Sequence, residues 1–283
     1  MNRYGAPAGR RSRVMRRGVS SSRFAFLPAS FLFLLVPVMA GAQSPASVLH
    51  ESGDPATESR AAQAEGFLFR APLVNIVLRG GFNIARAGSD VFDVAREQLT
   101  LETSDFSAFV IGVDMGVQVR DRIDIVAGFA HMSTSKPSSY SDYEDEDGLP
   151  ITQRTRFAQT PLTLGARYYL TSRGRQIGRF VWIPATVSPY IGAAGGVMRW
   201  EFVQTGSWVD FRDLAIFEDD FEAEGWTGIG QAIAGFDYSL GTRVMLNTEA
   251  RYTFGSDEMG RDFDVDPIDL SGFQLTMGLK FRF

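Results

Sequence analysis

His131 and Ser133 are residues that could act as a base and a nucleophile, and they lie two positions apart. Side chains at that spacing share one face of a β-strand, where an imidazole can take the proton of a hydroxyl and activate it as a nucleophile. Only the three residues His131-Met132-Ser133 carry this pattern, and no acidic residue can be assigned to orient the histidine. The ordinary interpretation is a histidine at the end of a strand beside a loop, with an enzyme that uses a nucleophilic serine as the alternative.

Charged residues at alternate positions of apolar segments are a second candidate for function. They are Asp114, Arg167, Glu249, Arg251, Lys280 and Arg282. On the inner face of a barrel they could gate a narrow polar conduit, or they could pair with one another in a packed interior. Buried charges need partners, and side chains fill an eight-stranded interior. We therefore favour the packed network.

Acidic residues cluster in three other segments, at 142–147, 218–224 and 262–269. Asp262, Asp264 and Asp266 have the spacing of calcium ligands. However, Pro267 stands where the turn needs glycine, and no bidentate glutamate follows at the right distance. We predict no metal site and no cofactor, and expect solvated loops. Aromatic residues among these charges could bind an extracellular ligand or mark a membrane interface; they are Tyr140, Tyr143, Trp208, Phe211, Phe217 and Phe221.

The elements that would position these residues are β-strands, because apolar residues recur with a period of two after residue 66. The clearest segment is the C-terminus, whose apolar residues are Phe273, Leu275, Met277, Leu279, Phe281 and Phe283. Its length matches a tilted strand that crosses a bilayer. Segments 109–119, 162–170 and 244–254 alternate in the same way, and 73–85, 123–132, 190–202 and 228–240 do so more weakly. We count eight strands.

The connections between these segments also follow a pattern. Asp121–Arg122 and 239–242 are short, and 171–188 is longer and basic. The connections at about 87–105, 134–153, 203–225 and 255–270 are long and acidic. Short turns on one rim and long loops on the other are typical of an outer-membrane barrel, with both termini on the short-turn side. The fold we predict is all-β, a closed antiparallel up-and-down transmembrane barrel of eight strands, or of ten if part of 203–225 pairs.

A soluble eight-stranded barrel, such as a lipocalin, is the main alternative fold. Such a barrel needs a polar exterior around a mostly apolar interior. Here one face of each clear strand is nearly pure Leu, Ile, Val, Phe and Met, and the other carries full charges. Burying those charges without partners costs several kcal/mol each, and a bilayer tolerates only a closed sheet. The pattern favours the membrane barrel.

The N-terminal region has the composition of an export signal. Residues 1–42 contain seven Arg and no acidic residue, then an apolar run from Phe24 to Ala40 and an A-x-A ending at Ala42. This arrangement predicts a cleaved signal peptide, followed by a polar flexible leader at 43–66 and the barrel at 67–283. The residues after the signal hold 33 acidic and 21 basic side chains, which disfavours a nucleic acid partner. The absence of Cys excludes disulfides and thiolate sites.

Three segments resemble known bacterial proteins. The ending FQLTMGLKFRF (273–283) looks like the C-terminal assembly signal of outer-membrane proteins. The segments TPLTLGARYYL (160–170) and PYIGAAGGVMRWEF (189–202) resemble small OmpA-type, OmpX-type and OmpW-type barrels. The spacing of His131 and Ser133 is similar to that of lipid A deacylases of the PagL type.

The barrel resemblance implies an integral protein of the bacterial outer membrane, inserted by the outer-membrane assembly machinery and surrounded by lipid and lipopolysaccharide. A barrel fold does not determine function. We predict a non-enzymatic structural or surface-interaction role through the acidic extracellular loops. The alternatives are a narrow channel for small or apolar solutes in the OmpW manner, and the hydrolase.

Overall fold

The computed structural model describes residues 68–145, 147–177, 181–210, 214–259 and 267–283. The predicted signal peptide and leader lie outside these residues, as do Glu146, Phe211, Asp262, Asp264 and Asp266. Within the described residues, no helix is long and apolar enough to cross a membrane.

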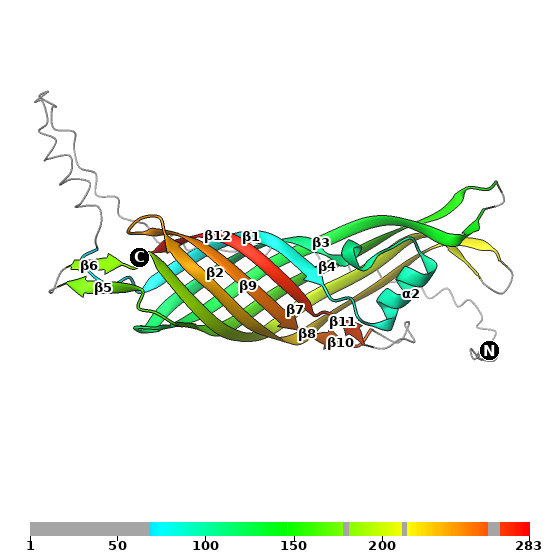
Figure 1. Ribbon diagram of the computed structural model, residues 1–283. Helices are drawn as coiled ribbons and strands as arrows, with labels where there is room; N and C mark the ends of the chain where they lie inside the picture. Colours follow the sequence, from blue (N-terminus) through cyan, green and yellow to red (C-terminus); the bar gives the residue numbers. More distant parts are fainter. Residues whose placement is uncertain (1–67, 146, 178–180, 211–213, 260–266) are drawn as a thin grey trace, which may run out of the picture. The chain divides into compact units, whose positions relative to one another are not determined.

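Strands dominate the described chain (Figure 1). Those of the main sheet are β1 (Val74–Ala85), β2 (Ala108–Arg120), β3 (Ile123–Glu144), β4 (Pro150–Tyr169), β7 (Val187–Val209), β8 (Ile216–Ser239), β9 (Val244–Phe254) and β12 (Gly272–Arg282). Two short hairpins pair β5 (Gly174–Ile177) with β6 (Val181–Pro184), and β10 (Ser256–Asp257) with β11 (Ile268–Asp269). The helix α2 (Asp90–Gln98) and a 3-10 turn (Thr103–Phe106) connect β1 to β2.

The main sheet closes on itself in the order β1-β12-β9-β8-β7-β4-β3-β2, and all neighbours are antiparallel. Closure is made by β1, which pairs with β2 on one side and with β12 on the other. The predicted eight-stranded barrel is therefore confirmed. The ten-stranded alternative is wrong, because most of residues 203–225 lengthen β7 and β8, which stay paired out to Val209 and Ile216.

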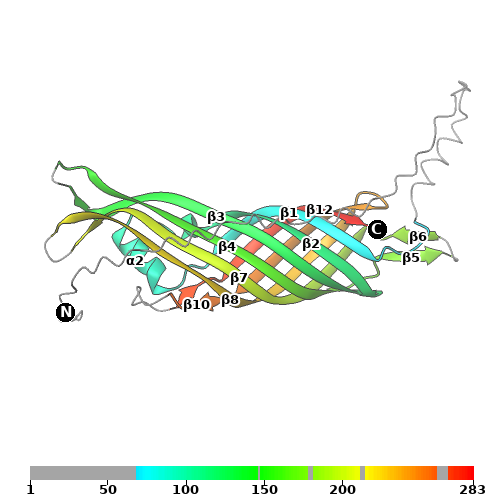
Figure 2. The same cartoon turned by 180° about the vertical axis from the view of Figure 1, so that it is seen from behind.

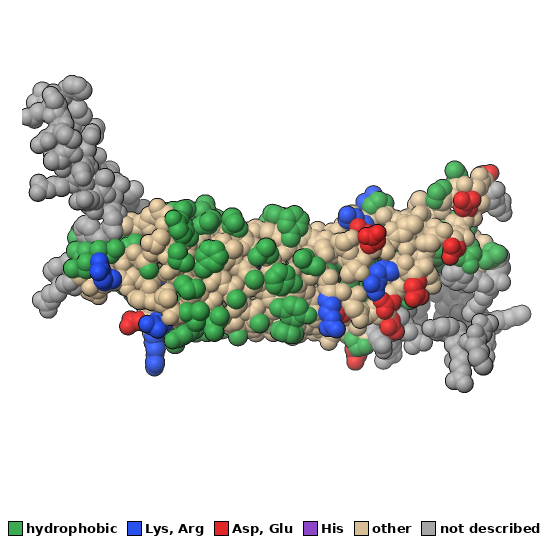
Figure 3. Space-filling model, in the orientation of Figure 1, with side chains coloured by type: hydrophobic (Ala, Val, Ile, Leu, Met, Phe, Trp, Pro, Cys, Tyr) green, Lys and Arg blue, Asp and Glu red, His purple; other side chains and the backbone are tan. Residues whose placement is uncertain are grey.

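The two faces of the barrel differ in polarity as predicted. Outward side chains of β2 and β12 are large, apolar and exposed: Phe109, Ile111, Val113, Met115, Val117, Val119, Phe273, Leu275, Met277, Leu279 and Phe283. Inward residues of the same strands include the buried Asp114, Gln274 and Lys280. On the face seen in Figure 3 the apolar side chains form a broad belt across the barrel, and the charged side chains gather beyond it. An apolar exterior around a charged interior is the arrangement of a transmembrane barrel.

The prediction of long loops is wrong for two of the four acidic segments. Residues 134–153 mostly continue β3 and β4, and 203–225 mostly continue β7 and β8, so both hairpins extend past the rest of the barrel (Figures 1 and 2). The outward residues of these extensions include Ser135, Arg154 and Arg156, which are exposed. Such polar outward positions suit water rather than lipid, so the apolar alternation that marks a membrane strand is missing there.

A helix replaces part of the loop predicted at 87–105. The nine residues of α2 bury Val91, Phe92 and Ala95 against the inner face of the strand extensions. The Phe92 ring makes edge contacts with Phe106, Phe157 and Phe202, at centroid distances of 4.7, 5.6 and 5.9 Å. A helix this short is marginal alone and depends on packing, which is why the sequence pattern did not reveal it.

The opposite end of the barrel carries the short connections and the C-terminal residue. The two-residue turn Asp121–Arg122 joins β2 to β3, as predicted. The longer basic connection contains the β5–β6 hairpin, whose Trp182 forms a two-way backbone bridge with Leu68, at 2.9 and 2.7 Å. We call this end the turn end, and the other the extension end.

We expect Phe92→Ala to loosen the extension end. The substitution removes a ring at the centre of the apolar cluster, and buried Phe→Ala changes cost about 3–5 kcal/mol. The refolded variant should show a lower unfolding midpoint and faster proteolytic cleavage within residues 86–107. Val94→Ala, on the exposed side of the same helix, is the matched control, and equal cleavage of both variants would contradict the assigned packing.

Candidate functional site

The middle of the barrel is occupied by a charge network centred on Asp114 of β2. Its carboxylate accepts hydrogen bonds from three arginines on three other strands: Arg79 of β1 (3.3 Å), Arg167 of β4 (2.6 Å) and Arg251 of β9. Glu249 pairs with Arg167 at 2.8 Å and with Arg251. All five side chains are at most 3% exposed. Charge-assisted bonds of this kind are the stronger hydrogen bonds of proteins.

A second group lies next along the interior toward the turn end. Lys280 donates to Asp237 (2.7 Å) and to the hydroxyl of Tyr169 (2.6 Å). Asn247 donates to Asp237 and to the hydroxyl of Tyr190, both at 2.8 Å, and that hydroxyl donates to Glu249 at 2.7 Å. The two groups therefore form one network, to which every strand of the main sheet except β3 contributes an inward side chain.

Inward glycines make room for these long side chains. A Cβ added to Gly128 of β3 would lie 2.9 Å from a carboxylate oxygen of Asp114, and one added to Gly112 would lie 3.0 Å from Cζ of Arg79. Both distances are shorter than ordinary carbon contacts. Glycine is thus required at these positions because charged side chains cross the interior there.

The interior has little free volume along most of its length. A void of about 10 Å³ lies beside Asp114, Arg167 and Arg251, which is near the minimum for one water molecule. The apolar cluster around Phe92 fills the extension end. At the turn end a polar cavity of about 260 Å³ remains, lined by residues that include Asn75, Asp237, Lys280 and Trp182.

The predicted lumen residues are partly brought together. Asp114, Arg167, Glu249, Arg251 and Lys280 share the network, whereas Arg282 lies apart at the turn end. Its guanidinium donates to the carbonyls of Thr242 (2.5 Å) and Gly241 (2.9 Å) and to the hydroxyl of Ser239 (3.3 Å).

Several network members were missed from sequence. They are Arg79, Tyr169, Tyr190, Asp237 and Asn247. Arg79 shares inward parity with the buried Asn75 and Asn83, so the alternation of β1 could have revealed it. Asp237 lies in a stretch rich in Gly and Ala, where neither face has a clear pattern.

His131 and Ser133 both face outward on β3, before its extension begins, and both are exposed. The imidazole Nδ1 lies 2.9 Å from the hydroxyl of Thr160 on β4, not from Ser133. No carboxylate of the described chain forms an ion pair with His131. The geometry therefore does not place a base, a nucleophile and an orienting acid together.

The acidic segments have two different arrangements. On β8 the even-numbered acids, Glu218, Asp220, Glu222 and Glu224, share the outward parity of the exposed Trp226. Glu224 pairs with Arg199 at 2.8 Å. At the β3–β4 turn, Asp145 accepts the backbone N–H groups of Asp147 (2.9 Å) and Leu149 (2.7 Å), so it shapes the turn.

Four of the aromatic residues among these acids contact one another at the extension end. Tyr140 meets Tyr143 and Trp208 edge to face at 5.9 and 6.4 Å, and Trp208 meets Phe221 at 4.8 Å. Contacts of this kind add to the stability of the packed side chains. Tyr140 and Trp208 pack on the apolar cluster inside the strand extensions, whereas Tyr143 and Phe217 are exposed.

The outer belt, the closed sheet and the charged interior together define a membrane-spanning β-barrel. No protein-family model matches the chain, and no curated protein sequence matches it. It is similar in structure to Neisserial surface protein A, at 12% identity and a TM-score of 0.44, over 75% of this chain and 98% of that one. The outer membrane protein OprG from Pseudomonas aeruginosa matches at 15% identity and a TM-score of 0.43, over 76% and 99%.

Ail of Yersinia pestis, crystallised in complex with the heparin analogue sucrose octasulfate, matches at 11% identity and a TM-score of 0.38, over 75% and 99%. The matched structures are small outer-membrane β-barrel proteins, the family that the sequence resembles.

Asp114→Asn should strongly destabilise the barrel. The change leaves three buried arginines short of a negative charge, and removing one partner of a buried ion pair costs about 3–5 kcal/mol. The midpoint of urea unfolding of the refolded protein, followed by tryptophan fluorescence, should fall clearly. Asp121→Asn, on the exposed β2–β3 turn, should leave the midpoint near that of the wild type. Equal midpoints for both variants would show that the network contributes nothing.

Proposed function

We propose that this chain is an integral barrel of the bacterial outer membrane, exported by a signal at residues 1–42 that is cleaved. The turn end faces the periplasm and the extension end faces outward, because outer-membrane barrels keep short turns on the periplasmic side. The apolar belt between the two ends supports this orientation, since polar and charged side chains gather beyond it on the extension end (Figure 3).

The proposed role is non-enzymatic and is carried by the outer surface rather than by the lumen. The observation that carries this proposal is the filled interior: an apolar cluster around Phe92, then the network of Asp114, then Trp182 over the periplasmic mouth. A barrel closed at successive levels can anchor and present a surface, which is a structural or surface-interaction role.

The two alternatives receive less support from the geometry. A narrow solute channel would need space where Asp114, Arg167 and Arg251 leave only about 10 Å³. A lipid hydrolase would need Ser133 in contact with His131, whose imidazole is engaged with Thr160 instead.

The surface proposed for interaction is the acidic outer face of β8. Four carboxylates at every second residue, from Glu218 to Glu224, present negative charge along one edge of the extension. Because charges of one sign attract an oppositely charged partner and speed its encounter, the extracellular ligand of this face should be cationic.

Insertion and lipid contact are proposed for the belt. The outward row of β12 and the following Phe283 would be recognised by the outer-membrane assembly machinery, as the resemblance implies. The same row faces the hydrocarbon in the inserted protein, while lipopolysaccharide surrounds the outer half.

Planar-bilayer recordings of the refolded mature chain should show no steady current for the wild type. Charge changes in the network should matter little, so Glu249→Gln should be equally silent while it remains folded. Folding is checked by resistance to proteolysis before each recording. If the wild type conducts and Glu249→Gln shifts its selectivity, the lumen carries the function and the closed-barrel proposal is wrong.

Neutralising the outer face of β8 should weaken binding of a cationic probe. A triple variant (Glu218→Gln, Asp220→Asn, Glu222→Gln) in lipid nanodiscs should associate with a lysine-rich peptide about tenfold more slowly at low salt. The matched control removes three acids at the β3–β4 turn (Asp142→Asn, Glu144→Gln, Asp147→Asn) and leaves Asp145 in place. Equal slowing in both variants would show that net charge, not the β8 face, attracts the peptide.

A further inference from the structure

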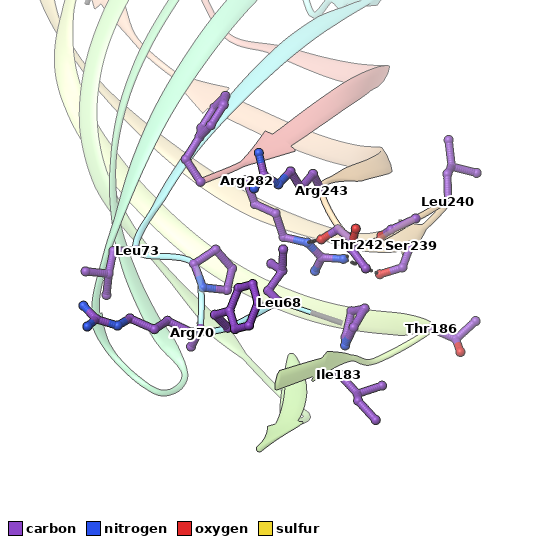
Figure 4. A pocket seen from close by; sticks show the side chains of 16 residues that line it. Leu68, Arg70, Leu73, Ile183, Thr186, Ser239, Leu240, Thr242, Arg243 and Arg282 are labelled. Carbon is purple, nitrogen blue, oxygen red and sulfur yellow. Dashed lines mark hydrogen bonds between the residues drawn. The ribbon is translucent and has the colours of Figure 1, made fainter. Parts of the chain in front are cut away.

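The periplasmic rim carries a groove of about 1160 Å³ that the closed lumen does not explain. Its walls are the segment 68–73, the end of β6, the turn 239–243 between β8 and β9, and the end of β12 (Figure 4). The groove therefore joins elements from both ends of the barrel sequence, which meet where β1 pairs with β12.

The charged side chains that line this groove are all positive. Its lining contains Arg70, Arg243 and Arg282, and none of the 16 lining residues is Asp or Glu. Figure 4 shows Arg282 reaching the turn after β8, where its guanidinium donates hydrogen bonds to two backbone carbonyls and one hydroxyl. In the described chain no carboxylate lies within ion-pair distance of Arg282, although this residue is only 4% exposed. Arg282 therefore makes no direct ion pair, and its positive charge, together with those of Arg70 and Arg243, favours an anionic ligand.

The groove is also apolar on the side that faces the membrane. Leu240 and Phe283 continue the outward rows of β8 and β12, and they are 58% and 60% exposed. Phe69 and Leu73, on the opposite wall, are exposed as well. A cationic site whose rim merges with the lipid-facing belt suits an amphiphile, because head group and chain then meet the surfaces they prefer.

We propose that this groove binds an anionic phospholipid of the periplasmic leaflet. The phosphate would lie between Arg243, Arg282 and Arg70, and an acyl chain would lie along Leu240 and Phe283. The assignment of the lipid to the periplasmic leaflet rests on the orientation proposed above. The choice of an anionic phospholipid as the ligand rests on the residues of the groove itself. A free phosphate shares the same charge but would leave the apolar rim and most of the volume unused.

Bound lipid would also connect the hairpin at the periplasmic mouth to the barrel. The Arg282 guanidinium stacks on the Trp182 ring, 5.2 Å from its centroid, and Arg282 lines both the groove and the 260 Å³ cavity inside the mouth. A phosphate that holds Arg282 in place therefore fixes the ring that covers this cavity.

The test is native mass spectrometry of the refolded mature chain in detergent, titrated with phosphatidylglycerol, with phosphatidylcholine or with inorganic phosphate. The wild type should retain phosphatidylglycerol about tenfold better than phosphatidylcholine. Arg70→Gln/Arg243→Gln should lose most of that preference, since both arginines are exposed and can be replaced without removing the buried contacts of Arg282. Arg120→Gln/Arg122→Gln removes two exposed arginines from the same rim outside the groove, and this control should retain the lipid.

Each other outcome overturns the proposal. Equal retention of the two lipids removes the requirement for an anion, and equal loss in both variants assigns the effect to rim charge in general. Inorganic phosphate that displaces phosphatidylglycerol at similar concentration makes the ligand a free anion rather than a lipid. Detergent solution has neither leaflets nor a conductance readout, so failure here is separate from failure of the closed-barrel proposal, which the bilayer recordings decide.

Discussion

The pairing of Asp114 with arginines from three other strands is the interaction on which the interior of this barrel depends. A bilayer forces the apolar side chains outward, so the charges that share those strands must point inward, where they have no bulk water. Their mutual pairing is then the condition for folding. Because Arg79, Arg167 and Arg251 reach Asp114 across the interior, the same contacts that stabilise the sheet also fill its lumen.

Side chains fill much of the barrel interior, and this bears on where a function can be proposed. The interior is packed from the aromatic residues around Phe92 to the network at Glu249 and Lys280. The proposals above therefore concern the surface: an acidic strand face beyond the belt at one end, and an arginine-lined groove at the other. The charged side chains of the two surfaces have opposite signs, which is why we propose different partners for them.

Most of the barrel could be predicted from alternation, because strand parity is a local property of the sequence. It assigned Glu249, Arg251 and Lys280 to one inward face. The errors occur where the environment changes along a strand. Outward residues such as Ser135 and Arg156 are polar and exposed. The apolar alternation is therefore missing in the extensions of β3 and β4, and the sequence analysis predicted a loop there. Arg282 was grouped with the network on parity alone, although its height in the barrel places it at the rim.

The sequence by itself determined that the chain forms alternating strands with an apolar and a charged face, and hence a membrane barrel. Only the tertiary structure decided which charges meet, that α2 seals one end, and that a groove forms where β1 meets β12. The physical reason is the separation along the chain between the residues that set each property. Parity is set by neighbouring residues, whereas Asp114 meets Arg251 through barrel closure and the relative register of strands 137 residues apart.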